Sequence, residues 1–474
     1  MSNTTTNTKK NDSVKLSDKD SKLRAFVLNG NMLRVVLYVC VPLAIYQEFN
    51  QLFHILDTMM ASHISAESVS TVAYLSQLLS IFGAVGTGLA MGSSIKISEA
   101  YGAGDYVLVR KRLSSLITLC AILGGAVLCI IPFVPQLLAV MGTPQTFITI
   151  GTKYFIITLL STVVNFFNSV YIAIERARGY SRRIMFLNFG VMFLKLTLTA
   201  VFIYGLNADI TMIAVATLIA QSALFLVAIW NLSRKNDVFG FSIRYISFTR
   251  GVIQPMLHIS FPVIAEKIAF ALGKTVINSM SKNYGTTVVG ALGVSNNLNG
   301  TVTTMQNGFQ DGGASIISQN VGAGNIKRAI SAFRTVLVLN IIIGFVGWLL
   351  LIAFRYPLTS IFATSINGLD TEFQQTIIRV FLWDCTGSCV SLGINSAIMS
   401  LLFGFGYTKL SLLINFSRVF VFRIPVLWAL QNFTNLGSQS VGIVMGVSNV
   451  CVALLAIVIA FFTLRHIRRA YPNT

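Results

Sequence analysis

Charged residues are scarce in this sequence. They make up 11% of the 474 residues, and only 16 of them are Asp or Glu. Soluble domains carry about 25% charged residues, so an ordinary soluble enzyme is excluded. No cluster of His, Cys and carboxylates has the spacing of a metal site, and no nucleophile constellation is present. The six cysteines all lie in apolar runs, which is typical of buried small side chains rather than disulfides.

Apolar residues take the place of the missing charge. The chain is 54% hydrophobic, with a mean hydropathy of +0.73. A helix needs about 20 apolar residues to cross ~30 Å of hydrocarbon. Runs of that length predict an all-α polytopic membrane protein with twelve transmembrane helices. They lie at 33–57, 69–97, 113–140, 147–173, 184–205, 211–232, 252–281, 287–318, 329–356, 373–403, 407–430 and 440–464.

The net charge of +19 is distributed unevenly along the chain. Basic residues gather in the polar tail and in alternate loops between the apolar runs. The intervening loops contain no Lys or Arg: 58–68, 141–150, 205–210, 283–286, 363–371 and 431–439. This asymmetry follows the positive-inside rule and predicts that both termini are cytoplasmic. We therefore expect membrane lipids, and no nucleic acid, as partners of the basic surface.

An internal repeat divides the chain into two similar halves. The segment ISEAYGAGD at 97–105 returns as ISQNVGAGN at 317–325, an offset of 220 residues. The segment GYSRRIMFLNF at 179–189 returns as GYTKLSLLINF at 406–416, an offset of 227. A repeat of six helices keeps both copies in the same orientation, so two parallel six-helix lobes should face a central cleft. The GAG glycines should cap helices and turn the chain.

The repeat also predicts the domain boundaries. We expect a disordered, polar cytoplasmic tail at 1–32, with a short surface helix at its end as an alternative, and an N-terminal lobe at 33–235. A cytoplasmic linker at 236–251 should lead to a C-terminal lobe at 252–465, followed by a cytoplasmic tail at 466–474.

Ionisable residues within the first apolar run are candidates for function, because each costs roughly 2.5–3.5 kcal/mol in a bilayer. At 100° per residue, Asn50, His54 and Asp57 share one stripe of the helix, with Gln51 close by. Such a stripe should face the cleft. Alternatively, Asp57 only marks the outer water interface, since it lies about 36 Å along the helix from Leu33.

The second half carries its own polar residues inside apolar runs. Lys267, Lys274 and Asn278 fall at i, i+7 and i+11, on one helix face. With Gln51, further residues complete the predicted substrate cavity: Lys195, Gln306, Gln310, Asp311 and Arg423. Lysine and arginine outnumber the acids in this set, so an anionic or zwitterionic substrate stays open beside a cationic one.

The order and spacing of these motifs resemble the multidrug and toxic compound extrusion (MATE) family, within the multidrug, oligosaccharidyl-lipid and polysaccharide exporters. The resemblance rests on Pro42 ahead of FHILD, the GAGD and GAGN turns, and the paired GYSRR and GYTKL segments. It implies a secondary active exporter, and no enzyme, in the cytoplasmic membrane of a prokaryote. Such a protein exchanges cations for drug-like or amphiphilic small molecules by alternating access. It implies a monomer without a cofactor.

The resemblance also implies roles for individual residues. Asp57, with His54 and Asn50, would couple transport to the proton, and Pro42 would be the hinge of the first helix. The carboxylates of the sodium-coupled branch fall on Ala271 and Ile394 here, so a proton is expected rather than sodium. A second interpretation is a flippase of the same superfamily for a lipid-linked or amphiphilic anion. The basic cavity residues favour the flippase, whereas twelve helices favour the exporter.

Overall fold

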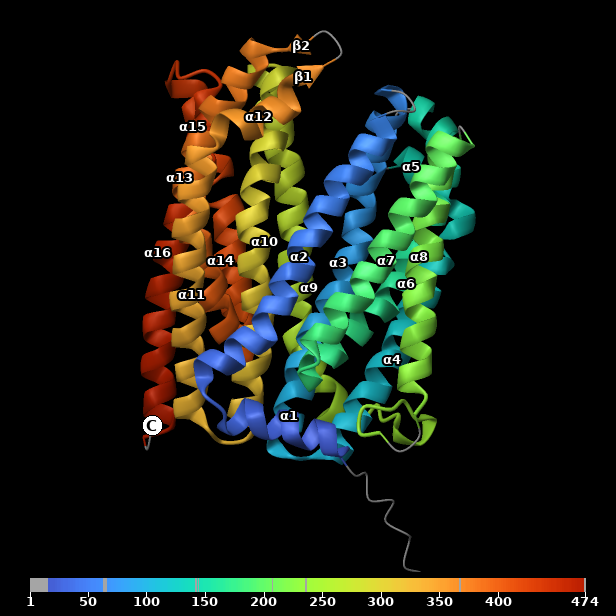
Figure 1. The fold of residues 1–474 in the computed structure, drawn as a ribbon, viewed down its shortest axis with the longest axis vertical. Helices are drawn as coiled ribbons and strands as arrows, with labels where there is room; N and C mark the ends of the chain where they lie inside the picture. The colour runs from blue at the N-terminus through green and yellow to red at the C-terminus, as the bar shows by residue number, and fades with distance from the viewer. Residues whose placement is uncertain are drawn as a thin grey trace, which may run out of the picture.

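The structure is a computed structural model that describes residues 16–62, 66–140, 143, 145–206, 208–234, 237–365 and 368–472. Some side chains within the helices also lie outside the description, among them those of His54 and Asp57. Across the described ranges, twelve long helices stand side by side in two groups (Figure 1). Eleven are long and apolar enough to cross a membrane; the twelfth, α10, carries many amides. The predicted polytopic all-α fold is confirmed.

The N-terminal lobe contains six of the long helices, with short extra turns at their ends. Its elements are α2 (Met32–Ser62), α3 (Ala66–Ala103), α4 (Tyr106–Leu128), the 3₁₀ turn η1 (Ile131–Phe133), α5 (Val134–Val140), α6 (Gln145–Arg178), α7 (Ser181–Ala200), the π turn η2 (Val201–Gly205) and α8 (Ile210–Leu232).

The C-terminal lobe repeats this arrangement and adds a two-stranded antiparallel pair at one end. Its elements are the 3₁₀ turn η3 (Ile243–Tyr245), α9 (Arg250–Ser281), the 3₁₀ turn η4 (Lys282–Tyr284), α10 (Thr286–Gly322), α11 (Ile326–Ala353), α12 (Arg355–Ala363), β1 (Thr364–Ser365), β2 (Gly368–Leu369), α13 (Thr371–Gly404), α14 (Thr408–Phe420), α15 (Ile424–Phe433) and α16 (Gln439–Ala470).

Equivalent helices have equivalent neighbours in the two lobes. Helix α2 packs on α7 and α3 on α6, as α9 packs on α14 and α10 on α13. The turns that follow them also match. Gly104 and Gly324 have φ of +81° and +76°, and Gly179 and Gly406 have φ of +92° and +79°. Only glycine adopts this left-handed conformation without strain, so the predicted helix-ending role of the GAG motifs is confirmed.

The two lobes meet tightly at the end of the bundle that carries the GAG turns and the C-terminus, which we call the basic end (Figure 1). Here α3 and α10 cross through their glycines. A Cβ atom on Gly102 would lie 2.0 Å from the carbonyl oxygen of Gln319, and one on Gly322 would lie 1.9 Å from that of Glu99. These positions are related by the repeat. The crossing therefore brings backbone against backbone and leaves no room for side chains.

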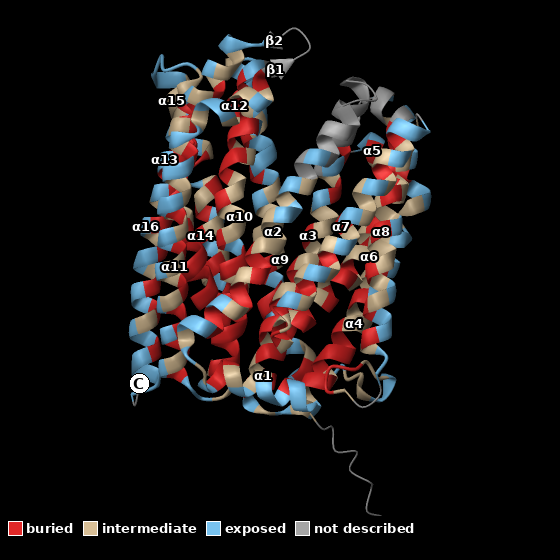
Figure 2. Ribbon diagram, viewed as in Figure 1, coloured by how far each residue is buried: buried red, intermediate tan, exposed pale blue. Residues whose placement is uncertain are grey.

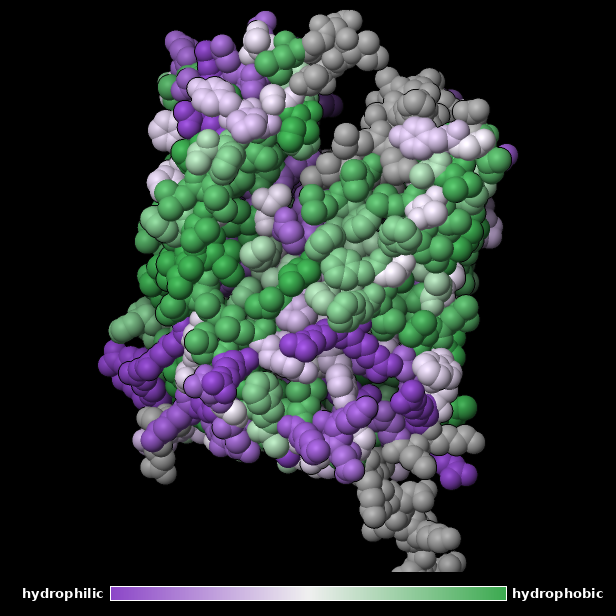
Figure 3. All heavy atoms as spheres, in the orientation of Figure 1, coloured by the Kyte–Doolittle hydropathy of each residue, from purple (hydrophilic) through white to green (hydrophobic). Residues whose placement is uncertain are grey.

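Towards the other end the lobes diverge (Figure 1), and buried residues concentrate where the lobes meet (Figure 2). The face of the molecule seen in Figure 3 carries a broad hydrophobic belt, and hydrophilic residues cover the basic end below it. An apolar belt of this kind is what a bilayer solvates.

A first helix, α1 (Asp18–Asn29), lies under the bundle at the basic end (Figure 1). Arg24 donates to the carbonyl oxygens of Tyr101 and Gly102 at 3.0 and 2.7 Å. From the other lobe, Arg328 donates to the carbonyl oxygen of Val27 at 3.1 Å. Residues 18–29 therefore form the short helix that was one expectation for the end of the tail, and they are not disordered, because α1 contacts both lobes through groups distant in sequence.

The carboxylate of Asp20 is the most buried polar group of α1. Arg178 donates to both of its oxygens at 2.6 Å, and also to Asp237 at 2.8 Å. Burial by itself raises the pKa of Asp20, but the hydrogen bonds from Arg178 and Ser17 outweigh it, so this pKa lies below its ordinary value.

Candidate functional site

A cavity of about 630 Å³ lies between the lobes, mostly against the C-terminal lobe. The N-terminal lobe contributes Gln47, Gln51 and Met91 to its wall. The longest stretch of the wall comes from α10: Leu292, Asn296, Asn297, Asn299, Gly300, Thr303, Asn307, Gln310 and Asp311. So many amides on one helix need water or polar partners inside a membrane. The position of α10 along the cavity supplies these partners, so this helix can be less apolar than the other spans.

The structure brings seven of the nine predicted cavity residues together in this wall. They are Gln51, Lys267, Lys274, Asn278, Gln310, Asp311 and Arg423. Gln51 reaches across from the N-terminal lobe, where its amide nitrogen lies 3.5 Å from the side-chain oxygen of Asn297. Their location is thus established for the described structure, and their role in substrate binding stays a prediction.

Two predicted cavity residues lie elsewhere. Gln306 is fully buried between helices, and its amide donates to the carbonyl oxygen of Cys389 on α13 at 2.8 Å. It holds α10 to α13 and is not part of the wall, because its amide is taken up by the backbone of the neighbouring helix. Lys195 lies half-buried on α7 in the N-terminal lobe, outside the wall of this cavity.

The residues predicted to couple transport to protons all lie on α2. Pro42 is buried within the helix, and Asn50 is exposed. His54 and Asp57 are in the half of α2 away from the basic end, and their side chains lie outside the described residues. Their predicted role is untested by the structure.

The same stretch of α2 borders the cleft between the lobes. Glu48 accepts a hydrogen bond from the hydroxyl of Thr304 on α10 at 3.0 Å, and Gln51 approaches Asn297 on the same helix.

Each described carboxylate in the cavity wall already has a partner. Glu266 on α9 accepts from the hydroxyl of Ser411 at 2.9 Å and from the amide of Asn415 at 2.8 Å, both on α14. These bonds fix the carboxylate against the helix next to its own.

Asp384 and Asp311 are held in different ways. Asp384 accepts from the hydroxyls of Ser295 and Ser388 at 2.8 and 2.6 Å. Asp311 forms an ion pair with Arg176 of the N-terminal lobe, at 3.1 Å. This ion pair joins the lobes on the closed side of the cavity.

The arginines of the wall are held by neutral groups. Arg418 Nε and Arg423 Nη2 both donate to the side-chain oxygen of Asn449, at 2.9 and 3.0 Å. Arg423 Nε also donates to Ser448 at 3.1 Å, and Asn449 in turn donates to Ser388 at 2.7 Å. A network anchored on α16 therefore sets the two guanidinium groups side by side.

The cations of the wall form no ion pair with a carboxylate of the described structure. Among the described residues, no carboxylate oxygen lies within 4.0 Å of a side-chain nitrogen of Lys267, Lys274, Arg418 or Arg423. Of the three carboxylates in the wall only Asp311 is paired with a base, so four cations face two carboxylate charges and the cavity keeps a net positive character.

Sequence reasoning missed part of this network. It identified Arg423 but not its partners Ser448 and Asn449, nor Asn415 and Asn395 in the wall. The available signal was an amide inside a strongly apolar helix such as α16, where an unpaired polar group is costly.

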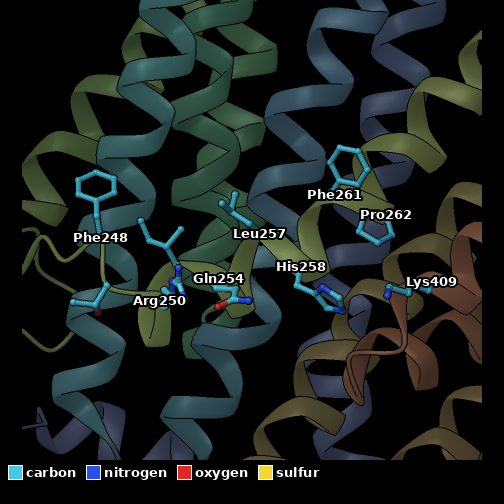
Figure 4. A pocket seen from close by; sticks show the side chains of 10 residues that line it. Phe248, Arg250, Gln254, Leu257, His258, Phe261, Pro262 and Lys409 are labelled. Atoms are coloured by element: carbon cyan, nitrogen blue, oxygen red, sulfur yellow. The ribbon is translucent and has the colours of Figure 1, made fainter.

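A second hollow, of about 710 Å³, lies on the outer surface near the start of α9. In Figure 4, His258 of α9 and Lys409 of α14 point towards each other, while Arg250 lies further along the groove. Phe248 and Phe261 on its rim are 56% and 74% exposed. This groove faces the surroundings of the bundle rather than the cleft, so it does not belong to the cavity between the lobes.

Both lobes of this chain are similar in sequence to known proteins. The MatE family model matches residues 42–201 and 262–429, one segment in each repeat. A probable multidrug resistance protein of Bacillus subtilis, YoeA, is 24% identical over 382 residues, which cover 79% of this chain and 81% of the relative.

Two solved structures share the fold at low sequence identity. One is an outward-facing conformation of a multidrug resistance MATE transporter, with a TM-score of 0.88, 18% identity, and coverage of 96% of this chain and 100% of that one. The other, from Pyrococcus furiosus, has a TM-score of 0.88 and 19% identity, covering 95% and 99%. It is described as a transporter in which reverse polarity of the binding pocket suggests a different function.

Proposed function

This chain belongs to the MatE family of membrane transporters, and on that premise we propose that it is a secondary active exporter driven by protons. Its substrates would be drug-like or amphiphilic small molecules, exchanged for protons by alternating access. Relatives that are named as multidrug resistance and multidrug export proteins support the transport of small molecules.

The observation that carries this proposal is the difference between the two ends of the bundle. At the basic end, the backbones of Gly102 and Gln319 are in contact, while a cavity of about 630 Å³ lies between the lobes beyond this seal. An arrangement closed on one side of a central site is one of the two states that alternating access requires. With the basic end in the cytoplasm of a prokaryote, as the positive-inside rule favours, this is the outward-facing state.

Asp57 is the proposed proton acceptor, in the half of α2 that is away from the seal. From there a proton can arrive from the outer side without crossing the closed end. Coupling requires that the proton and the substrate favour different states, because a ligand that binds both states equally shifts neither. His54, one turn earlier, would tune or relay that proton.

The test is transport by purified protein in liposomes, with proton and sodium gradients imposed separately. We expect uptake of a probe substrate to follow the proton gradient, and Asp57→Asn to lose gradient-driven uptake while folding normally. Asp18→Asn changes an exposed carboxylate on α1 and is the matched control. Undiminished proton-driven transport by Asp57→Asn would remove Asp57 from the mechanism, and transport driven by sodium alone would refute proton coupling.

A second candidate function is a flippase for a lipid-linked or amphiphilic anion. The four cations in the cavity wall favour it, and the related fold from Pyrococcus furiosus is described as having a pocket of reverse polarity. A flippase would move its substrate between leaflets of a liposome without an imposed proton gradient.

A further inference from the structure

We propose that the C-terminal side of the cavity is a preformed site for an anionic group, a phosphate or carboxylate, carried by the substrate. Lys267, Lys274, Arg418 and Arg423 would bind it. The proposal rests on the function proposed above, since the site lies in the transport cavity, and it assigns the charge of the substrate.

The four cations converge from two adjacent helical segments. Lys267 and Lys274 are seven residues apart on α9, which places them on one face. Arg418 lies near the end of α14 and Arg423 in the turn before α15, and α9 packs against α14. All four side chains line the same cavity. Converging cations in a space of this size suit a compact anion with several oxygens.

The acids in the wall cancel only part of this charge. Asp311 is paired with Arg176, Glu266 is bound by Ser411 and Asn415, and Asp384 is bound by two serine hydroxyls. Four cations thus face the cavity together with two carboxylates that have neutral donors of their own. The local excess is positive.

The arginines are positioned in a way that leaves their charge available. Asn449 accepts from both guanidinium groups, and this neutral oxygen draws two like charges together without neutralising them. Arg423 is only 5% exposed, so its charge is largely removed from water. Two neighbouring guanidinium groups repel one another at low dielectric, and an anion bound between them would relieve that repulsion. Bidentate binding of phosphate or carboxylate is the favoured geometry of guanidinium.

Polar atoms without partners lie in the same wall. Asn299 is 5% exposed, and both its amide nitrogen and its amide oxygen lack a hydrogen-bond partner in the described structure. Such atoms are rare in the interior unless water or a ligand satisfies them. The nitrogen of Asn299 is a donor suited to an anion.

The repeat shows that the fold does not require these charges. At the offset of 220 residues, Lys267 and Lys274 correspond to Gln47 and His54. At the offset of 227, Arg418 and Arg423 correspond to Val191 and Leu196.

The N-terminal lobe therefore builds the same helix packing with neutral or weakly basic side chains at all four positions. Cations inside a membrane protein are costly and mark function by default. The N-terminal lobe has Lys195 on α7, outside the cavity wall, so the four cations that line the cavity all come from the C-terminal lobe and point to a ligand there.

Binding measurements without any gradient test this site. Wild-type protein in phosphatidylcholine nanodiscs is titrated with dodecyl phosphate, dodecyltrimethylammonium and inorganic phosphate. We expect dodecyl phosphate to bind about tenfold or more tightly than the trimethylammonium compound of equal chain length, because charge-assisted hydrogen bonds are lost in the latter. If inorganic phosphate displaces dodecyl phosphate at an equal concentration, the site binds a free anion. Failure of inorganic phosphate to compete assigns the site to an amphiphile, and both results support an anion site.

Single variants locate the binding groups. Arg423→Gln and Lys274→Gln should each weaken dodecyl phosphate binding about tenfold, and Arg423→Lys should lose less because it keeps the charge. Lys409→Gln removes a cation from the outer groove and should bind like wild type. Lys274 is exposed to the cavity, so its variant should fold even if Arg423→Gln does not. Tighter binding of the trimethylammonium compound, or equal binding by Lys274→Gln and wild type, would overturn the proposal.

The outcome separates this site from the proposed function. Anion binding without proton-driven transport would leave the site in place and refute the exporter. Proton-driven transport of cations by a protein that does not bind dodecyl phosphate would support the exporter and refute the anion site.

Discussion

The two lobes of this protein share a backbone plan and differ in the chemistry of their inner faces. The N-terminal lobe offers Gln47 and Gln51 to the cavity, whereas the C-terminal lobe offers four cations. Residues that shape the backbone are kept in both copies. Gly102 and Gly322 allow the close contact at the basic end, and Gly104 and Gly324 end helices α3 and α10. The comparison teaches that close packing was retained in both halves while the polar side chains diverged.

The largest expected effect breaks the symmetric seal. Gly102→Ala and Gly322→Ala each place a Cβ about 2 Å from a backbone oxygen of the other lobe, which cannot rotate away. Each should cost about 3 kcal/mol, the upper end for overpacking, and the two costs should be equal. Thermal unfolding of the purified protein measures this.

A glycine with open surroundings provides the control for the seal. Nothing lies near a Cβ on Gly125 of α4, so Gly125→Ala should stabilise its helix by about 0.5–1 kcal/mol. A markedly smaller cost for one of the two seal variants would show that the lobes are not equivalent at the crossing.

The next effect concerns a feature that only one copy has. Arg176 and Asp311 pair across the lobes, and their repeat positions are Phe403 and Met91. Arg176→Gln and Asp311→Asn should each cost about 2 kcal/mol, less than a fully buried pair because the cavity is hydrated. The double variant should cost less than their sum, with a coupling of about 1–2 kcal/mol. Strict additivity would mean that the pair does not join the lobes.

A smaller effect separates two glutamines one helical turn apart. Gln306→Leu should cost about 1 kcal/mol of stability, since it removes the hydrogen bond to Cys389. Its substrate binding should be unchanged. Gln310→Leu should show the opposite pattern, because Gln310 lines the cavity. Unfolding and ligand titration of both variants measure the contrast, and a binding defect in Gln306→Leu would return that residue to the cavity.

The smallest effect concerns α1, which contacts the two lobes differently. Asp20→Asn should weaken α1 docking by about 1 kcal/mol, because Arg178 keeps Asp237 as a partner. The pKa of Asp20 is lowered in the folded protein, so its stabilisation is present above the unfolded value of about 3.9 and is lost as the pH falls further. Hydrogen exchange of α1 at several pH values measures this. Asp18→Asn, which alters an exposed carboxylate, should leave the profile unchanged.

Much of the fold could be predicted from the sequence, because a membrane span depends on the length and hydropathy of one continuous segment. The repeat was equally visible, as were the glycines that end α3 and α10. The candidate site was predicted in part. Gln306 and Gln310 carry the same side chain on the same helix, and composition could not say which one faced the cavity. A short surface helix at the end of the tail was one expectation from the sequence, but its docking was not predictable, because it depends on Arg178 and Arg328, which belong to other helices.

The sequence alone determined the number of spans, the duplication and the excess of positive charge. The spans and the charge follow from the residue types along the chain, and the duplication follows from a constant offset between matching residues. Only the tertiary structure decided which polar groups meet. Arg176 pairs with Asp311, and Arg423 donates to Asn449. In each pair the two residues come from different helices that are separated along the chain and adjacent in space. A buried charge takes its function from such partners, since they determine whether it is neutralised or left facing a ligand.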